Sequence, residues 1–319
     1  MTRSKQQTAG RGRRPKRGEG GPAVSGEPGR VLATKGRKVV VQGDDATFVC
    51  HLLGHRVVIG DEVSFERASD GWGKILDVAP RQRALVRADF QGREQVCASG
   101  LGGLLVVAAA DHPPYRSGLM DRYEVAAALT GVDVAVVLTK SDLGVPAEVE
   151  ADLAERQRRG LPVLRVTPTA GEGLDALRAF LRDARAPGPW ALVGHSGVGK
   201  TSILKALLPE QDVGPIGEVS DYWEQGRHTT TGSRIFEVAP GVELADSPGI
   251  RTFLPSGLRA DQVRLHFPGV GVVPCRYRDC LHRPGEDGCV ADAHVDADTL
   301  VRYRRLLDEV LQMESRVRR

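Results

Sequence analysis

One glycine-rich stretch of the chain has the residue types and spacing of a phosphate-binding loop. It consists of Gly194, His195, Ser196, Gly197, Val198, Gly199, Lys200 and Thr201. An apolar run over residues 190–193 precedes it and an expected helix over residues 202–208 follows, so backbone N–H groups and the helix dipole converge on one point. The lysine would neutralise β- and γ-phosphates, the threonine would hold Mg²⁺, and Ser202 is counted with them as nucleotide-binding. The predicted substrate is a nucleoside triphosphate.

A second motif ends an expected strand over residues 134–138. It consists of Thr139, Lys140, Ser141 and Asp142. The Asp142 carboxylate can accept hydrogen bonds from guanine N1 and N2, a donor pair that adenine lacks, while the Lys140 stem packs along the base. The match is short, but it lies at the C-terminal end of a strand, where ligands of α/β sheets bind. Lys205 is the last lysine of the chain, so a guanine-reading motif must precede the phosphate loop.

Two further segments complete the expected nucleotide site. Asp-Ser-Pro-Gly starts at Asp246, whose carboxylate would join the Mg²⁺ shell, and the Gly249 N–H would meet the γ-phosphate. Between this motif and the phosphate loop, residues 226–231 are expected as a switch loop that contacts Mg²⁺ through Thr230. Residues 167–173 are expected either as a second base-contacting loop or as a plain connection from strand to helix.

The group that orients the attacking water is not plain from the sequence. Ile250 stands where many GTPases carry a glutamine, and a hydrophobic side chain cannot orient water, so slow intrinsic hydrolysis is expected. We assign this role to His228, acting with Lys200 and Thr230 when a partner orders the switch loop. The other interpretation is that His228 is an ordinary loop residue with no catalytic role. Alternative candidates are Arg227 and Arg251, which would stabilise the charge that develops on the phosphate.

The elements that position these residues alternate between strands and helices. Expected strands cover residues 104–109, 134–138, 163–166 and 190–193, followed by a hairpin of 234–238 with 242–245. Expected helices cover residues 119–130, 147–159, 174–184 and 202–208. This order predicts a mainly parallel sheet of six strands with one antiparallel hairpin. With the guanine motif ahead of the phosphate loop, it fits a circularly permuted α/β P-loop GTPase domain, placed at residues 89–254.

The segment before this domain has short alternating stretches separated by turns. Strands are expected at residues 38–41, 46–52, 62–67 and 74–78, which makes residues 31–88 an all-β barrel of OB type. RNA binding is favoured over mere packing against the neighbouring domain, although few exposed aromatic residues are expected for stacking. The supporting basic residues are Arg37, Lys38, Arg81, Arg83 and Arg87. Residues 1–30 contain eight Lys/Arg and two Glu, which predicts a disordered basic tail that binds RNA or only aids solubility.

A group of potential metal ligands lies near the end of the chain. Its members are Cys275, Cys280, His282 and Cys289, with His294 as a spare candidate. Three thiolates and one imidazole satisfy a single structural Zn²⁺ and leave no open position for hydrolytic chemistry. Cys50 and Cys97 are expected as core thiols. An amphipathic helix is expected over residues 298–317. Together with the zinc ligands it predicts a zinc-binding, mostly α domain over residues 255–319.

Taken together, these motifs resemble the ribosome small-subunit-dependent GTPase A family, and the likeness covers nearly all of residues 31–319. Gly-Arg-His-Thr-Thr-Thr, Asp-Ser-Pro-Gly-Ile-Arg and the cysteine spacing occur together in one chain. The resemblance implies a GTP hydrolase that binds the small (30S) ribosomal subunit and its rRNA, acts in late maturation, and is stimulated by the subunit and released on hydrolysis. It also ranks His282 above His294 as the ligand. The family's usual Asn is Thr139 here, so a looser loop is expected, while Lys140 and Asp142 retain the main contacts.

Composition and length set the remaining expectations. Net charge is +3, and the longest apolar run, residues 104–110, is far too short to span a bilayer. A cytoplasmic monomer with no membrane partner is expected, which binds GTP or GDP with Mg²⁺. The alternatives from other classes are a P-loop kinase or ATPase acting on a small molecule, and an RNA-binding module with a vestigial nucleotide site.

Overall fold

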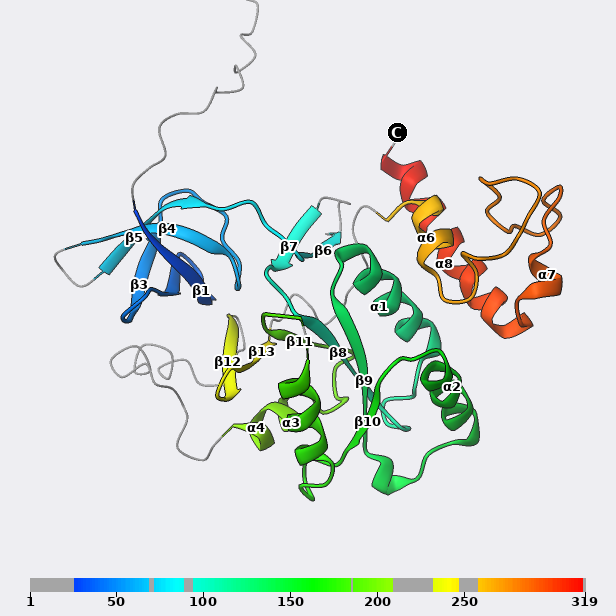
Figure 1. The fold of residues 1–319 in the computed structure, drawn as a ribbon, viewed down its shortest axis with the longest axis horizontal. Helices are drawn as coiled ribbons and strands as arrows, with labels where there is room; N and C mark the ends of the chain where they lie inside the picture. The colour runs from blue at the N-terminus through cyan, green and yellow to red at the C-terminus, as the bar shows by residue number, and fades with distance from the viewer. Residues whose placement is uncertain are drawn as a thin grey trace, which may run out of the picture.

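The computed structural model describes residues 26–68, 72–88, 94–184, 186–208, 232–246 and 258–317. In chain order these residues form a β-barrel, an α/β domain and a helical C-terminal region (Figure 1). A sheet of eleven strands runs through the first two parts. Among the helices described, none combines the length and the apolar character needed to cross a lipid bilayer.

The barrel is closed by its first strand. Its strands are β1 (Glu27–Lys35), β2 (Lys38–Gln42), β3 (Thr47–Leu52), β4 (Glu62–Arg67) and β5 (Trp72–Val78). β1 pairs with both β2 and β4, and β3 pairs in parallel with β5, so the five strands form a closed ring. Alternate side chains such as Val39, Phe65 and Ile75 point inward and are buried. The expected OB-like barrel is confirmed.

Two domain boundaries differ from those expected. Backbone pairs of Glu27 with Phe65 and Arg30 with Glu62 place residues 27–30, expected in the tail, within the barrel. A hairpin of β6 (Leu85–Ala88) with β7 (Glu94–Ala98) crosses the expected boundary after residue 88. Glycine, proline and arginine are not typical of a strand, and the partners of this segment in β4 lie more than thirty residues away along the chain, so the sequence does not show the strand.

The α/β domain has the six strands expected, all parallel except for one hairpin. The strands are β8 (Gly103–Ala109), β9 (Asp133–Thr139), β10 (Val163–Val166), β11 (Trp190–Val193), β12 (Ser233–Ala239) and β13 (Val242–Asp246). The helices are α1 (Ser117–Thr130), the 3₁₀ helix η1 (Ser141–Leu143), α2 (Ala147–Arg158), α3 (Leu174–Asp183) and α4 (Lys200–Leu207). Val106 of β8 packs on the α1 and α2 side, while Val107 packs on the side of α3 and α4.

The barrel and the α/β domain are joined through the sheet. Thr34 of β1 pairs with Ser233 of β12, which continues the sheet from one part into the other. Arg30 donates a hydrogen bond of 2.8 Å to Glu243 of β13 across the junction. Cys50 and Cys97 are buried as expected, and burial raises the pKa of the Cys50 thiol to about 12.

The C-terminal region packs against α1. It contains α6 (Ala260–His266), α7 (Ala291–His294) and α8 (Ala297–Val317). Val125 of α1 lies in the same apolar cluster as Val263 of α6 and Leu307 of α8. The apolar face expected on the last helix is buried there, at Leu300, Tyr303, Leu306, Leu307 and Val310.

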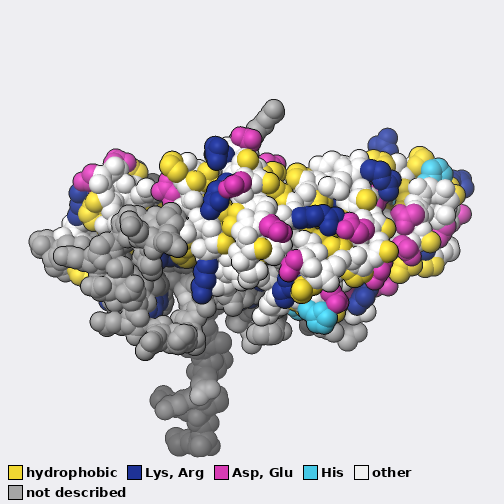
Figure 2. Space-filling model, turned by 90° about the horizontal axis from the view of Figure 1, so that it is seen from below, with side chains coloured by type: hydrophobic (Ala, Val, Ile, Leu, Met, Phe, Trp, Pro, Cys, Tyr) yellow, Lys and Arg dark blue, Asp and Glu magenta, His cyan; other side chains and the backbone are white. Residues whose placement is uncertain are grey.

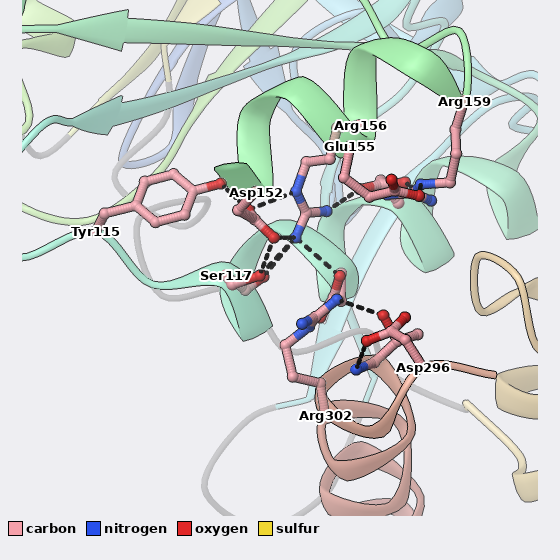
Figure 3. A network of polar contacts seen from close by, with 11 residues as sticks. Tyr115, Ser117, Asp152, Glu155, Arg156, Arg159, Asp296 and Arg302 are labelled. Carbon is pink, nitrogen blue, oxygen red and sulfur yellow. Dashed lines mark hydrogen bonds and ion pairs between the residues drawn. The ribbon is translucent and has the colours of Figure 1, made fainter. Parts of the chain in front are cut away.

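A buried ion network ties α1, α2 and α8 together (Figure 3). Arg156 of α2 is completely buried and pairs with Asp121 of α1 at 3.0 Å and with Asp152 at 2.9 Å. The other oxygen of Asp121 accepts a hydrogen bond of 2.7 Å from Arg302 of α8. Burial alone would raise the pKa of Asp152, but hydrogen bonding from Arg156 holds it below its ordinary value. A buried arginine with three carboxylate neighbours is expected to fix the relative positions of these helices.

Candidate active site and metal centre

The sheet topology brings the guanine motif, the phosphate loop and Asp246 to one edge. β8, β9, β11 and β13 are parallel, so their C-terminal ends coincide. Thr139 at the end of β9 pairs with Ala109, and Val193 at the end of β11 pairs with Val106. β13 is the neighbour of β11 and ends at Asp246. Segments that are distant in sequence therefore leave the sheet side by side.

The phosphate loop wraps around the N-terminus of α4. Gly194 has φ +131°, and a Cβ there would lie 2.2 Å from the Val107 carbonyl oxygen, so only glycine fits. Gly199, with φ +98°, caps α4, whose first turn contains no acidic residue. The Lys200 ammonium is buried and donates to the carbonyls of Gly194 at 2.7 Å and His195 at 2.5 Å. This leaves the helix N-terminus and one cation together at the loop, as phosphate binding requires.

The remaining loop residues divide into buried and exposed positions. Val198 is buried under the loop. The exposed members are His195, Ser196, Gly197, Thr201 and Ser202. The Thr201 hydroxyl, in the first turn of α4, is thus accessible to an ion at the same edge as Asp246. Hydroxyl and carboxylate oxygens are suitable ligands for Mg²⁺, directly or through water, so the described residues fit that ion.

Thr139 joins the guanine motif to the phosphate loop. Its side chain is 1% exposed, and its Oγ1 donates a hydrogen bond of 2.7 Å to the Val198 carbonyl. The Ala108 carbonyl lies 3.2 Å from the same oxygen. A looser loop was expected from the absence of the family's Asn amide, but here the threonine hydroxyl holds the two loops together.

Thr139→Val is expected to weaken GDP binding about tenfold. The substitution retains the shape of the side chain but removes the donor, leaving the Val198 carbonyl unpaired at a cost of about 1–3 kcal/mol. Calorimetric titration with GDP measures the effect. Thr130→Val is the matched control, because the Thr130 hydroxyl bonds only to backbone carbonyls of its own helix α1. Equal GDP affinity in wild type and Thr139→Val would contradict the assigned tether.

The base-reading side of the site is open. Lys140 has a left-handed backbone with φ +58°, and its Nζ donates to the His112 carbonyl. Ser141 is half-buried, whereas Asp142 is exposed, and its carboxylate has no hydrogen-bond or ion-pair partner among the residues described. The 167–173 loop follows the adjacent strand β10 and is closed by a 3.0 Å bond from the Thr167 N–H to the Glu172 carbonyl. Its position beside the guanine motif suits a base-contacting loop, which stays a prediction.

Several predicted site residues lie outside the described part of the chain. These are His228, Thr230 and Gly249, together with the alternatives Arg227, Ile250 and Arg251. Asp246 is described, is half-buried, and lies opposite Arg234 in the β12–β13 hairpin. Its carboxylate has no ion pair within the described ranges.

The four C-terminal ligands converge in the structure. Nδ1 of His282 lies 3.3 Å from Sγ of Cys275 and 3.5 Å from Sγ of both Cys280 and Cys289. The Cys275 and Cys289 sulfurs are 3.9 Å apart. Tetrahedral Zn²⁺ with Zn–S of about 2.3 Å and Zn–N of about 2.0 Å places S–S edges at about 3.8 Å and S–N edges at about 3.5 Å. The donor set therefore fits one zinc ion.

The surroundings of the cluster hold its ligands in place. The backbone N–H groups of His282 and Val290 point at the sulfurs of Cys280 and Cys275, at 3.4 Å each. Arg304 of α8 donates to the His282 carbonyl at 2.9 Å. Burial lowers the pKa of His282, which favours the neutral imidazole that binds metals. His294 lies outside the cluster, and its Nδ1 is 2.9 Å from the Val290 carbonyl.

The sequence did not reveal an aromatic surface on the barrel. The ring of Trp72 stacks on His51 with centroids 4.7 Å apart, and the Lys38 ammonium lies 4.3 Å from the Trp72 ring centroid. These residues come from β5, β3 and β2, so only strand pairing brings them together. Trp72 lies just ahead of the strand expected over residues 74–78, whereas β5 begins at Trp72.

Comparisons with known proteins agree with this architecture. The family model described as RsgA GTPase matches residues 78–254. Proteins named small ribosomal subunit biogenesis GTPase RsgA from Chromohalobacter salexigens and Pseudomonas syringae pv. tomato are each 36% identical to the chain. The first alignment covers 88% of this chain and 85% of the relative, and the second covers 92% and 89%.

Solved structures share the fold. YjeQ from Thermotoga maritima superposes with a TM-score of 0.68 at 20% identity, covering 89% of this chain and 98% of that one. YloQ, described as a circularly permuted GTPase, gives 0.62 at 19% identity, covering 90% and 95%. The matching family model and the curated relatives are GTPases, so the P-loop kinase considered from the sequence is set aside. By its matching family model and its relatives, the chain is a GTPase of the RsgA family.

Proposed function

We propose that the protein binds the small (30S) ribosomal subunit in the cytoplasm, acts in its late maturation as a monomer, and couples subunit-stimulated GTP hydrolysis to its own release. The name shared by the relatives, small ribosomal subunit biogenesis GTPase, supports the partner. The observation that supports the chemistry is the common edge of the sheet, where Thr139 bonds the guanine motif to the phosphate loop beside Asp246.

The residues predicted for the nucleotide site have separate tasks in hydrolysis. Lys200 neutralises the β- and γ-phosphates, while Asp142 selects guanine over adenine. Thr201 and Asp246, with Thr230, would hold Mg²⁺, which supplies neutralisation of phosphate charge when bound. The Gly249 N–H contacts the γ-phosphate, and His228 orients the attacking water.

Chain connectivity supports coupling between hydrolysis and release. Residues 247–257 join the end of β13 directly to the C-terminal region, which starts at Leu258 in the described structure. Release of the γ-phosphate contact at Gly249 therefore acts on a segment attached to the zinc-binding region. That region is the part whose hold on the subunit would change.

The barrel is proposed as an rRNA-binding module. Trp72 with His51 and Lys38 offers a stacking platform next to a cation, and Arg37 is exposed in the adjacent turn. Three of the basic residues expected to bind RNA have structural partners instead. Arg81 pairs with buried Asp61 at 2.8 Å, Arg83 donates to the Pro187 carbonyl, and Arg87 donates to the Gln95 side chain at 2.7 Å.

GTPase assays with and without purified 30S subunits test this proposal. Wild type is expected to hydrolyse GTP slowly alone and at least about tenfold faster with subunits. The reason is that no glutamine orients the attacking water, and the residue proposed to do so acts only when the subunit orders the switch loop. His228→Ala is expected to bind subunits but to lose about 10²-fold of the stimulated rate. His294→Ala, an exposed histidine of α7, serves as the control. Equal wild-type rates with and without subunits would remove the subunit as activator.

A further inference from the structure

Four arginines line a cavity between α1, the phosphate loop and α8. The cavity has a volume of about 580 Å³ and lies at the N-terminus of α1. Its arginines are Arg116, Arg122, Arg302 and Arg305, with His195 of the phosphate loop beside them. None of its described lining residues is acidic. The α/β domain and the C-terminal region thus both contribute cations to one concave surface.

Two of these arginines form a fixed wall. The side chains of Arg122 and Arg302 are each 24% exposed. Arg302 is held by hydrogen bonds to Asp121 at 2.7 Å and to Thr299 at 3.0 Å. Figure 3 shows Arg302 reaching from α8 to the network around Arg156. A guanidinium held in this way loses little side-chain entropy when an anion binds.

The other two arginines are available at the mouth. Arg116 is exposed, and its guanidinium has no hydrogen-bond or ion-pair partner among the residues described. It precedes the first turn of α1, which contains no acidic residue and has no side-chain cap. Arg305 is 81% exposed, with Glu309 at 3.7 Å as its ion-pair partner, and Arg122 shares that same glutamate. Positive charge at the mouth is therefore in excess.

We infer that this cavity binds phosphates of an RNA backbone, an inference that rests on the proposed binding to the ribosomal subunit. Guanidinium groups pair with phosphate oxygens through parallel N–H donors, and the N-terminus of α1 adds backbone donors. The described lining holds no carboxylate that would repel a phosphate, and its guanidinium groups can pair with the phosphate of any nucleotide, so this backbone contact is independent of base sequence. The volume exceeds that of one phosphate, and its four arginines come from two helices, α1 with its N-cap and α8, which favours a chain of phosphates over a small anion.

The position of the cavity would let bound RNA contact both the phosphate loop and the C-terminal region. His195 belongs to the phosphate loop, whereas Arg302 and Arg305 belong to α8, the last helix of the C-terminal region that contains the zinc ligands. Over the face drawn in Figure 2, Lys/Arg and Asp/Glu side chains are interspersed in small groups. Because the formal net charge of the chain is only +3, a local arginine cluster rather than a general positive field is the feature to test.

The test compares the affinity of Arg116→Ala/Arg305→Ala and wild type for 30S subunits over a range of salt concentrations. Full-length protein with Mg²⁺ and a non-hydrolysable GTP analogue is used, and binding is measured by fluorescence anisotropy. The double variant is expected to bind about tenfold more weakly at low salt. The slope of log K against log salt should become shallower by about one for each phosphate that the variant no longer neutralises. GDP affinity should stay at the wild-type value, and Arg116→Lys/Arg305→Lys should retain most of the slope.

The matched control is Arg158→Ala/Arg182→Ala. Arg182 is exposed on α3, on the opposite face of the sheet from α1, and Arg158 is 74% exposed with a helical ion pair to Glu155, as Arg305 has with Glu309. If wild type binds subunits and the cavity variant binds them with the same affinity and salt dependence, the inference is overturned and the proposed function stays intact. Wild type that fails to bind subunits would refute the proposed function itself. Pyrophosphate is tested as a free anion on GDP-loaded protein. If it binds wild type but not the cavity variant, while both bind subunits with equal affinity, the cavity is a site for a free anion and the RNA assignment is overturned.

Discussion

Asp142→Asn is expected to lower GTP and GDP affinity by about 100-fold and to raise affinity for xanthosine nucleotides. The carboxylate accepts from both guanine N1 and N2, whereas an amide offers one acceptor and places an N–H₂ donor against N2. Losing a hydrogen bond to a charged group costs about 1.5–3 kcal/mol, which corresponds to a factor of about 10–150. Xanthine carries an oxygen at position 2, so the new amide donor gains a partner there.

Competition titrations with GDP, XDP and ADP measure this exchange of specificity. Asp133→Asn is the control, because Asp133 is an exposed aspartate at the start of the same strand, β9, on the opposite edge of the sheet. Unchanged GDP affinity in Asp142→Asn would show that the exposed carboxylate does not read the base. That result would also favour the alternative considered from the sequence, an RNA-binding module with a vestigial nucleotide site.

Local features of the chain were predictable because they depend on neighbours in sequence. Apolar runs such as Val163–Val166 and Trp190–Val193 were located to the residue, since a buried parallel strand is apolar along its whole length. The cysteine spacing predicted a cluster that the structure brings within 4.8 Å. The helix expected over residues 298–317 differs from α8 by one residue at its start.

Features that depend on partners distant in sequence were missed. The first part of β1 has the composition of a tail and becomes a strand only by pairing with β4. The Thr139 tether is invisible from sequence because its acceptor, the Val198 carbonyl, is a backbone group 59 residues away. The arginine cavity likewise requires that α8 pack on α1, which no local pattern indicates.

Loss of one zinc ligand is expected to unfold the C-terminal region while the nucleotide site survives. Cys289→Ala should reduce bound zinc from one per chain to about a tenth or less, because structural Zn²⁺ supplies about 10–16 kcal/mol of folding free energy in small domains. The loop between Cys275 and Cys289 has few apolar groups to replace that contribution, apart from Leu281 beneath it. Elemental analysis by mass spectrometry measures the metal, and limited proteolysis reports the loss of structure after residue 257.

The control and the nucleotide readout separate local from global damage. His294→Ala should keep one zinc per chain, because His294 lies outside the cluster and bonds only to the Val290 carbonyl. GDP affinity of Cys289→Ala should stay within about threefold of wild type, since Lys200 and Asp142 are positioned by the sheet rather than by the zinc loop. Full zinc content in Cys289→Ala would exclude this cysteine from the ligand set. A complete loss of GDP binding would instead mean that α1, through Val125, depends on the zinc-binding region for its own stability.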